Sequence, residues 1–101
     1  MAEVARLARF RIDPALREDV FAAYTEYVAA VRKEDGVRVW EICTEAEDAN
    51  IVWLFVRSAD AVAHEDHRSS EAAAQLGSVL IPAIVGSPEF HDLQPHFSNR
   101  P

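Results

Sequence analysis

Sulfur, long apolar runs and basic charge are all scarce in this sequence. A single cysteine, Cys43, cannot form an internal disulfide, so packing must hold the fold and a cytoplasmic location is the simplest expectation. The longest apolar run, residues 79–85, is interrupted by Pro82. It is much shorter than the roughly 20 residues of a membrane-spanning helix, so we expect no membrane segment.

The charge balance is acidic. Lysine and arginine total 10 against 17 aspartates and glutamates, which gives a net charge of −7. No basic stripe is available to neutralise phosphates, so nucleic acid is not an expected partner, and an anionic membrane would repel the chain. Residues 1–4 contain no charged segment leading into an apolar run, so no signal peptide is expected.

The length and the apolar content predict one domain. The chain has 101 residues, of which 50% are hydrophobic, so it can build a core but is too short for two domains. We therefore expect a single domain over residues 1–101. A chain of this size buries a modest share of its surface, so a partner subunit would add stability.

Hydrophobic periodicity divides the chain into strands and helices. Alternating or continuous apolar residues predict strands, and apolar residues three and four apart predict helices. Asp13, Ser58 and Ser70 are expected helix caps, and Pro82 is expected to kink or end the last helix. The predicted strands are 4–12, 37–44, 51–57 and 89–94; the predicted helices are 14–33, 59–68 and 71 onward; the predicted turns are 45–50 and 86–88.

This order predicts an α+β fold of the ferredoxin-like, split β-α-β type, with an antiparallel sheet and helices on one face. The third strand is nearly all apolar, so we expect it inside the sheet with both faces covered. Large apolar side chains fall on both strand faces, among them Phe10, Trp40, Trp53 and Phe55. One subunit cannot cover both faces, which predicts a homodimer packed sheet on sheet.

Four stretches of the chain resemble a known family: residues 33–41 after the first helix, the apolar third strand, residues 58–70, and residues 86–91. Together they make the chain similar to the antibiotic-biosynthesis-monooxygenase superfamily of dimeric α+β barrels, in particular its quinol-monooxygenase-like and quorum-signal-processing members. Within 58–70, His67-Arg68-Ser69 matches the family's helix histidine followed by a basic and a small residue.

The resemblance implies an enzyme that oxidises an aromatic, polycyclic or quinol-type small molecule with dioxygen and without a cofactor. His67 would then be the base or orienting group, and Arg57 would stabilise charge. The expected substrate-binding residues are Trp40, Trp53, His64 and Phe55. An imidazole suits proton transfer near neutral pH, and flat rings stack on aromatic substrates.

Other interpretations of the same residues remain open. Val56 and Ser58 occupy positions where the family commonly has a glutamate and an aromatic residue, which favours a non-catalytic, dimeric ligand-binding protein. An isomerase could use His67 without oxygen. His64, His67 and Glu71 have a spacing compatible with metal ligation, but a solvated polar helix face explains it equally, and we expect no metal. The tryptophans could equally be ordinary core or dimer-interface residues. Arg57 could equally be an arginine at the end of a strand whose side chain reaches solvent.

Overall fold

Four strands and three α-helices form two packed layers. The computed structural model describes residues 2–99, so residues 1, 100 and 101 of the expected domain lie outside the described part. The elements in chain order are β1 (Val4–Ile12), the 3-10 turn η1 (Pro14–Leu16), α1 (Arg17–Val31), β2 (Val37–Glu45), β3 (Asp48–Ser58), α2 (Ala61–Arg68), α3 (Glu71–Ala83) and β4 (Ile84–Leu93).

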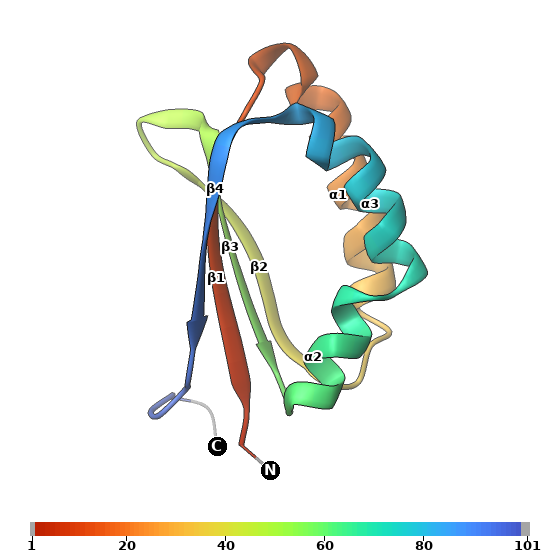
Figure 1. Ribbon diagram of the computed structural model, residues 1–101, viewed down its shortest axis with the longest axis vertical. Coiled ribbons are helices and arrows are strands. Elements are labelled where there is room, and N and C mark those ends of the chain that lie inside the picture. The colour runs from red at the N-terminus through yellow and green to blue at the C-terminus, as the bar shows by residue number, and fades with distance from the viewer. Residues whose placement is uncertain (1, 100–101) are drawn as a thin grey trace.

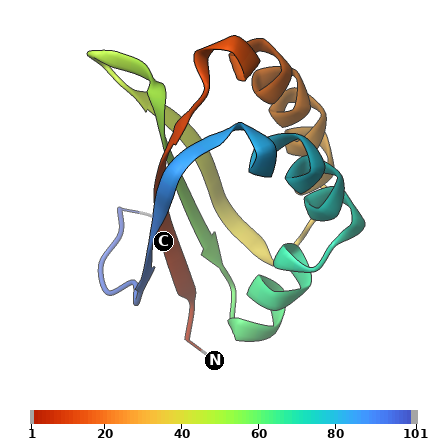
Figure 2. The ribbon, with the colours of Figure 1, turned by 45° about the horizontal axis from the view of Figure 1, so that its top comes forward.

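The sheet has the strand order β2-β3-β1-β4, and every neighbouring pair is antiparallel. All three helices lie on one side of the sheet (Figures 1 and 2). The predicted α+β ferredoxin-like fold is therefore confirmed. The third strand is an inner strand as expected, but elements of the described chain cover only one of its faces.

Strand alternation assigns each side chain to one of two faces. The helix-covered face carries Phe10 and Ile12 of β1 and Val52 of β3, which belong to the buried core. The open face carries Leu7 of β1 opposite Phe55 of β3, and Arg9 opposite Trp53. Directly opposed residues in an antiparallel pair share a face, so this register fixes both sets. The core is completed by Val20, Tyr24, Tyr27, Val31 and Ala83.

The first helix begins later than the sequence predicts. Asp13 caps the segment as expected, because its side chain accepts a hydrogen bond from the Ala15 amide at 2.9 Å. Residues 14–16 then form a 3-10 turn, and the α-helix starts only at Arg17. It is 15 residues long, and no described helix is both long and apolar enough to cross a membrane.

Of the caps predicted for the next two helices, Ser58 is wrong and Ser70 is confirmed. Ser58 is not a cap: it is the last residue of β3 and is fully buried. Asp60 caps α2 instead, accepting from the Ala63 amide at 2.8 Å, so the helix starts at Ala61 and not at Ala59. Ser70 caps α3 as predicted, accepting from the Ala73 amide at 3.0 Å.

The last strand is longer than predicted, and the turn expected over residues 86–88 is wrong. β4 begins at Ile84, directly after the last turn of α3, which contains Pro82. Gly86 has φ +76° beside a register shift between Arg9 and Arg11 of β1, so the glycine serves a bulge. Pro88 is tolerated because β4 is an edge strand.

Candidate functional site

His67 lies buried near the end of α2 with both ring nitrogens hydrogen-bonded. Its Nδ1 is 3.0 Å from Glu34 Oε2, and its Nε2 is 3.2 Å from Tyr27 Oη. An ionised carboxylate can only accept, so Nδ1 carries the ring proton. In the neutral ring, Nε2 then accepts a hydrogen bond from the Tyr27 hydroxyl. We call these three residues the Tyr27–His67–Glu34 chain.

Three separate segments of the protein supply the residues of the Tyr27–His67–Glu34 chain. Tyr27 is on the inward face of α1, and Glu34 lies in the short connection between α1 and β2. The same connection holds the start of α2, because the Gly36 carbonyl accepts from the Ala59 amide at 2.8 Å. This bond fixes the distance between Glu34 and the helix that carries His67. The contact partners are 33 and 40 residues apart in the sequence.

An aromatic cluster surrounds the tyrosine end of the chain. Tyr27 packs edge-on against Trp40 with ring centroids 5.5 Å apart, and Tyr24 lies 5.9 Å from the same indole. Burial, with a smaller contribution from the Glu34 carboxylate, raises the pKa of Tyr27 to about 12. Burial also raises the pKa of Tyr24. Both tyrosines are therefore neutral hydroxyl groups at neutral pH.

Several buried polar atoms around this cluster have no hydrogen-bond partner. They include Tyr24 Oη and Trp40 Nε1, next to Tyr27, and His64 Nδ1, one turn before His67 on α2. Buried polar atoms are nearly always paired in folded proteins, so an unpaired set in one region calls for an explanation. A polar small molecule or ordered water bound beside the cluster would satisfy them.

Three surface pockets lie next to these buried residues, and the smallest, of about 120 Å³ between α1 and α3, is lined by Tyr27 itself. The α2–β4 pocket, of about 500 Å³, opens between α2, the start of β1 and the end of β4, and His64 is part of its wall. The β2-side pocket, of about 300 Å³, lies between the end of α1 and β2, and both Glu34 and Trp40 line it. Its other wall residues are Val28, Val31, Arg32, Val37 and Arg38. Residues next to His67 thus reach three separate openings.

The structure places the candidate site residues predicted from the sequence on two different sides of the sheet. It brings His67 and Trp40 together through Tyr27, and it places His64 one helical turn from His67. Trp53 and Phe55 lie on the open face, on the other side of the sheet. Trp53 Nε1 donates to Glu45 Oε2 at 3.0 Å there.

Arg57 shares the open face with Trp53 and Phe55 and does not reach His67. Its register partners are Ala5 on β1 and Val39 on β2. Its side chain is 12% exposed, and its Nε forms an ion pair with Glu3 Oε1 at 3.8 Å. A guanidinium held in this way is close to a sheet end and remote from the helix layer.

Tyr27 and Glu34 are site residues that sequence reasoning missed. The sequence identifies Tyr27 only as one member of an apolar helix stripe, and Glu34 only as part of an acidic helix end. Neither position has a local signal, because each contact depends on how α2 folds back over α1. The one available hint is the position of Tyr27 on the same helix stripe as Val20 and Val31, which predicts an inward side chain.

The geometry does not favour metal binding by the histidines of α2. Among residues 2–99, no group of three or more histidine, cysteine, aspartate or glutamate side chains is arranged to hold a metal ion. Both nitrogens of His67 are already bonded to Tyr27 and Glu34. Glu71 is in the first turn of the next helix, α3, so the helical spacing assumed for a shared face does not apply.

The fold and the buried polar cluster define a class: a ferredoxin-like α+β protein with an aromatic-lined candidate site between sheet and helices. The family model described as antibiotic biosynthesis monooxygenase matches residues 4–76, and the chain belongs to that family. No curated protein matches the chain.

Solved structures agree with the family assignment at low sequence identity. Rv0793 from Mycobacterium tuberculosis has 23% identity and a TM-score of 0.86, with 97% of this chain and 99% of that chain covered. A Bacteroides thetaiotaomicron protein named for the same family has 25% identity, a TM-score of 0.87 and coverages of 97% and 93%. One from Caulobacter crescentus, also named for the family, has 16% identity, a TM-score of 0.88 and coverages of 95% and 92%. These likenesses show the fold.

Proposed function

We propose that this protein oxidises an aromatic, polycyclic or quinol-type small molecule with dioxygen, as a homodimer and without a cofactor. The observation that supports the proposal is the Tyr27–His67–Glu34 chain, a connected proton path inside an aromatic cluster. Family membership supports the reaction type.

The Tyr27–His67–Glu34 chain is suited to accept a proton from a substrate. The neutral Tyr27 hydroxyl takes the proton of a substrate O–H or acidic C–H as its own proton moves to His67 Nε2, so that the substrate becomes an anion and the tyrosine hydroxyl is restored. The Glu34 carboxylate, bonded to Nδ1, stabilises the imidazolium that results. In this arrangement His67 is the base, and Tyr27 is the group that the substrate meets.

The oxidation itself draws its electrons from the substrate. The deprotonated substrate transfers electrons to dioxygen, and a new carbon–oxygen bond forms. The proton held by His67 returns to the distal oxygen to give a hydroperoxide. The oxygen–oxygen bond then breaks, water leaves with the second hydrogen of that carbon, and a carbonyl remains. Buried surroundings favour these steps because they keep water from the reactive anion.

We assign the remaining candidates by their position. Trp40 lies against Tyr27 and would form one wall for a flat substrate. His64 would be a second wall toward the α2–β4 pocket. Trp53, Phe55 and Arg57 are on the open face, so we propose that they contribute to the contact with a second subunit and not to the proton transfer.

Oxygen uptake tests this proposal. Wild-type protein is mixed with anthrone or 1,4-naphthohydroquinone, and uptake is measured against the spontaneous rate. We expect His67→Ala to lower the enzymatic rate roughly 10²–10⁴-fold, the usual size of a general-base contribution. Tyr27→Phe should lower it too, because the path from substrate to His67 is broken. His96→Ala, at an exposed histidine outside the helices and strands, is the matched control.

Equal uptake by wild type and His67→Ala would remove His67 as the base. Deuterium exchange into a carbonyl substrate without oxygen uptake would replace oxidation by isomerisation on the same proton path. Thermal stabilisation by these ligands without turnover or exchange would leave a binding protein.

A further inference from the structure

The α2–β4 pocket holds two guanidinium groups in one concave wall of an otherwise acidic protein. Arg6 from β1 and Arg68 from the end of α2 line it together with His64 and with two carboxylates, those of Glu65 and Asp92. The two arginines and the two carboxylates balance, whereas the protein as a whole has a net charge of −7, so this wall is a local departure from the acidic surface.

The two arginines are available to an incoming anion because their present partners are exposed. Arg6 Nε pairs with Asp92 Oδ1 at 3.1 Å, and the Asp92 side chain is 82% exposed. Arg68 Nη1 pairs with Glu65 Oε2 at 3.7 Å, and the Glu65 side chain is 66% exposed. Such surface pairs contribute little energy, so a ligand carboxylate can replace them while both acids turn to solvent.

Further features of the wall suit an aromatic acid. Its apolar part is made by Val4, Ala5, Ala61 and Leu93. The Arg6 guanidinium lies over the ring of Phe90, outside the pocket lining and 4.9 Å from the ring centroid, which restricts the arginine. His64 Nδ1 is buried without a hydrogen-bond partner. Burial, and then the charges of Arg6 and Arg68, lower the pKa of His64, so this ring is neutral at neutral pH and can donate a hydrogen bond without adding charge.

The position of the pocket links it to the candidate site. His64 and His67 are three residues apart on α2, so they are neighbours on one helix surface. One turn of helix therefore separates the pocket that holds Arg6 and Arg68 from the proton path.

We propose that the α2–β4 pocket binds the carboxylate of the substrate, so that the protein selects aromatic acids whose oxidisable ring lies remote from the acid group. This inference rests on the proposed function for the identity of the ring, but the recognition of the carboxylate stands on the pocket alone.

The test compares binding of one acid with binding of its ester. The probes are 6-hydroxy-2-naphthoate, whose phenol and carboxylate lie at opposite ends of a flat bicyclic ring, and its methyl ester. Isothermal titration calorimetry on the wild-type protein should give roughly tenfold tighter binding of the acid, as expected for charge-assisted hydrogen bonds at a partly exposed site. Added salt should weaken binding of the acid more than binding of the ester.

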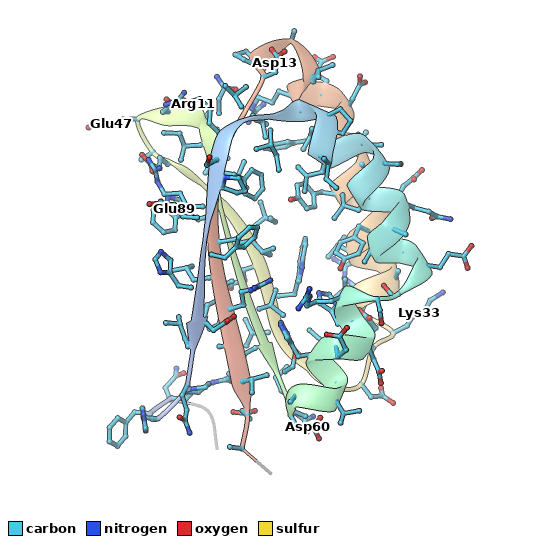
Figure 3. The ribbon with its side chains drawn as sticks, in the orientation of Figure 1. Arg11, Asp13, Lys33, Glu47, Asp60 and Glu89 are labelled. Atoms are coloured by element: carbon cyan, nitrogen blue, oxygen red, sulfur yellow. The ribbon has the colours of Figure 1, made fainter. Side chains whose placement is uncertain are left out.

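Three variants sharpen the comparison. Arg6→Gln combined with Arg68→Gln should bind acid and ester equally. Asp92→Asn should bind the acid severalfold more tightly than wild type, because it removes the carboxylate that competes for Arg6. Arg11→Gln is the matched control. Arg11 is on β1, as Arg6 is, and it forms a similar ion pair with Asp48 at 3.0 Å. It lies at the end of the sheet opposite Asp60 and α2 (Figure 3). This variant should leave the preference unchanged.

The inference is overturned if wild type binds acid and ester equally or binds neither at millimolar concentration. An unchanged preference in the double variant, or an equal loss in Arg11→Gln, also overturns it. If the double variant does not fold, the exposed Arg68→Gln alone and the wild-type comparison decide the question. Preference for the acid without oxygen uptake would refute the oxidation and keep the acid pocket; uptake without preference would do the reverse.

Discussion

Tyr24 and Tyr27 are the two tyrosines of this protein, and both are buried on the inward face of α1. Their ionisation therefore reports on the candidate site without interference from other tyrosines. Tyr27 donates to His67 and is near the negative charge of Glu34, whereas the Tyr24 hydroxyl has no hydrogen-bond partner. Both surroundings oppose phenolate formation, for partly different reasons.

We expect the folded protein to form no phenolate near pH 10, where tyrosines in an unfolded chain ionise. Ultraviolet absorbance during an alkaline titration, with circular dichroism to follow folding, measures this. Tyr27 should ionise near pH 12. The unfolded chain loses its tyrosine protons first, so stability should fall as the pH rises from 10 to 12.

Glu34→Gln is the informative variant in this titration. It removes the carboxylate charge that contributes to the raised pKa of Tyr27, so the phenolate step should move to lower pH while burial keeps it above 10. Tyr27→Phe should remove that step. A phenolate signal near pH 10 from protein that is still folded would contradict the buried, hydrogen-bonded position of Tyr27.

Single residues were predictable from the sequence where a local pattern identified them. His67 stands out because it lies on a short predicted helix and matches a family position. Tyr27 and Glu34 were not predictable, since their contacts with His67 span 40 and 33 residues and depend on tertiary packing. The sequence assigns Trp53 and Trp40 to one site because both are large aromatics, although strand pairing puts them on opposite faces.

At the scale of elements, α2 is held in place by a close contact with the α1–β2 connection. A Cβ atom added at Gly36 would lie 2.6 Å from the Cβ of Ala63 in α2, which is too close for an unchanged backbone. Gly77 in α3 is different, because the nearest atom to an added Cβ is Ile81 Cδ1 at 3.6 Å. The two glycines therefore provide a matched pair.

Gly36→Ala should destabilise the protein by about 1–3 kcal/mol, because overpacking forces α2 away from the connection that carries Glu34. Gly77→Ala should stabilise it by about 0.5–1 kcal/mol, since alanine is the better helix former and the added methyl makes only an ordinary contact with Ile81. Urea unfolding curves measure both. Equal signs for the two changes would mean that α2 is not packed against Gly36 as described.

Strands and helices were more predictable than their ends. The first strand has the predicted bounds, Val4–Ile12, because its alternation is regular and Asp13-Pro14 follows it. The start of α2 was misplaced because Ser58 and Asp60 are both good caps, and only the pairing of Ser58 with Val4 and Val37 decides between them. The last strand was shortened because glycine and proline usually signal turns, whereas an edge strand with a bulge accommodates both.

At the scale of the molecule, the open face combines large apolar side chains with charged ones, and the charge of Arg9 near its centre is paired within the chain. Leu7, Trp53 and Phe55 contribute its apolar area. Arg9 donates to Glu45 Oε2 at 3.1 Å and lies 3.7 Å from Glu89 Oε2, so its charge is neutralised within the chain. A paired charge of this kind can be covered by a partner subunit at lower cost than an isolated charge.

We therefore expect the protein to sediment as a dimer at micromolar concentration, with the two open faces in contact. Phe55→Glu should raise the dissociation constant roughly a hundredfold or more, because it puts an unpaired carboxylate in the middle of the contact. Val62→Glu is the control, since Val62 is 62% exposed on α2, on the other side of the sheet. A wild-type monomer at these concentrations, or equal effects of the two changes, would remove the sheet face as the contact. The Tyr27–His67–Glu34 chain would remain, because one subunit supplies all three residues, and only the roles proposed for Trp53, Phe55 and Arg57 would be lost.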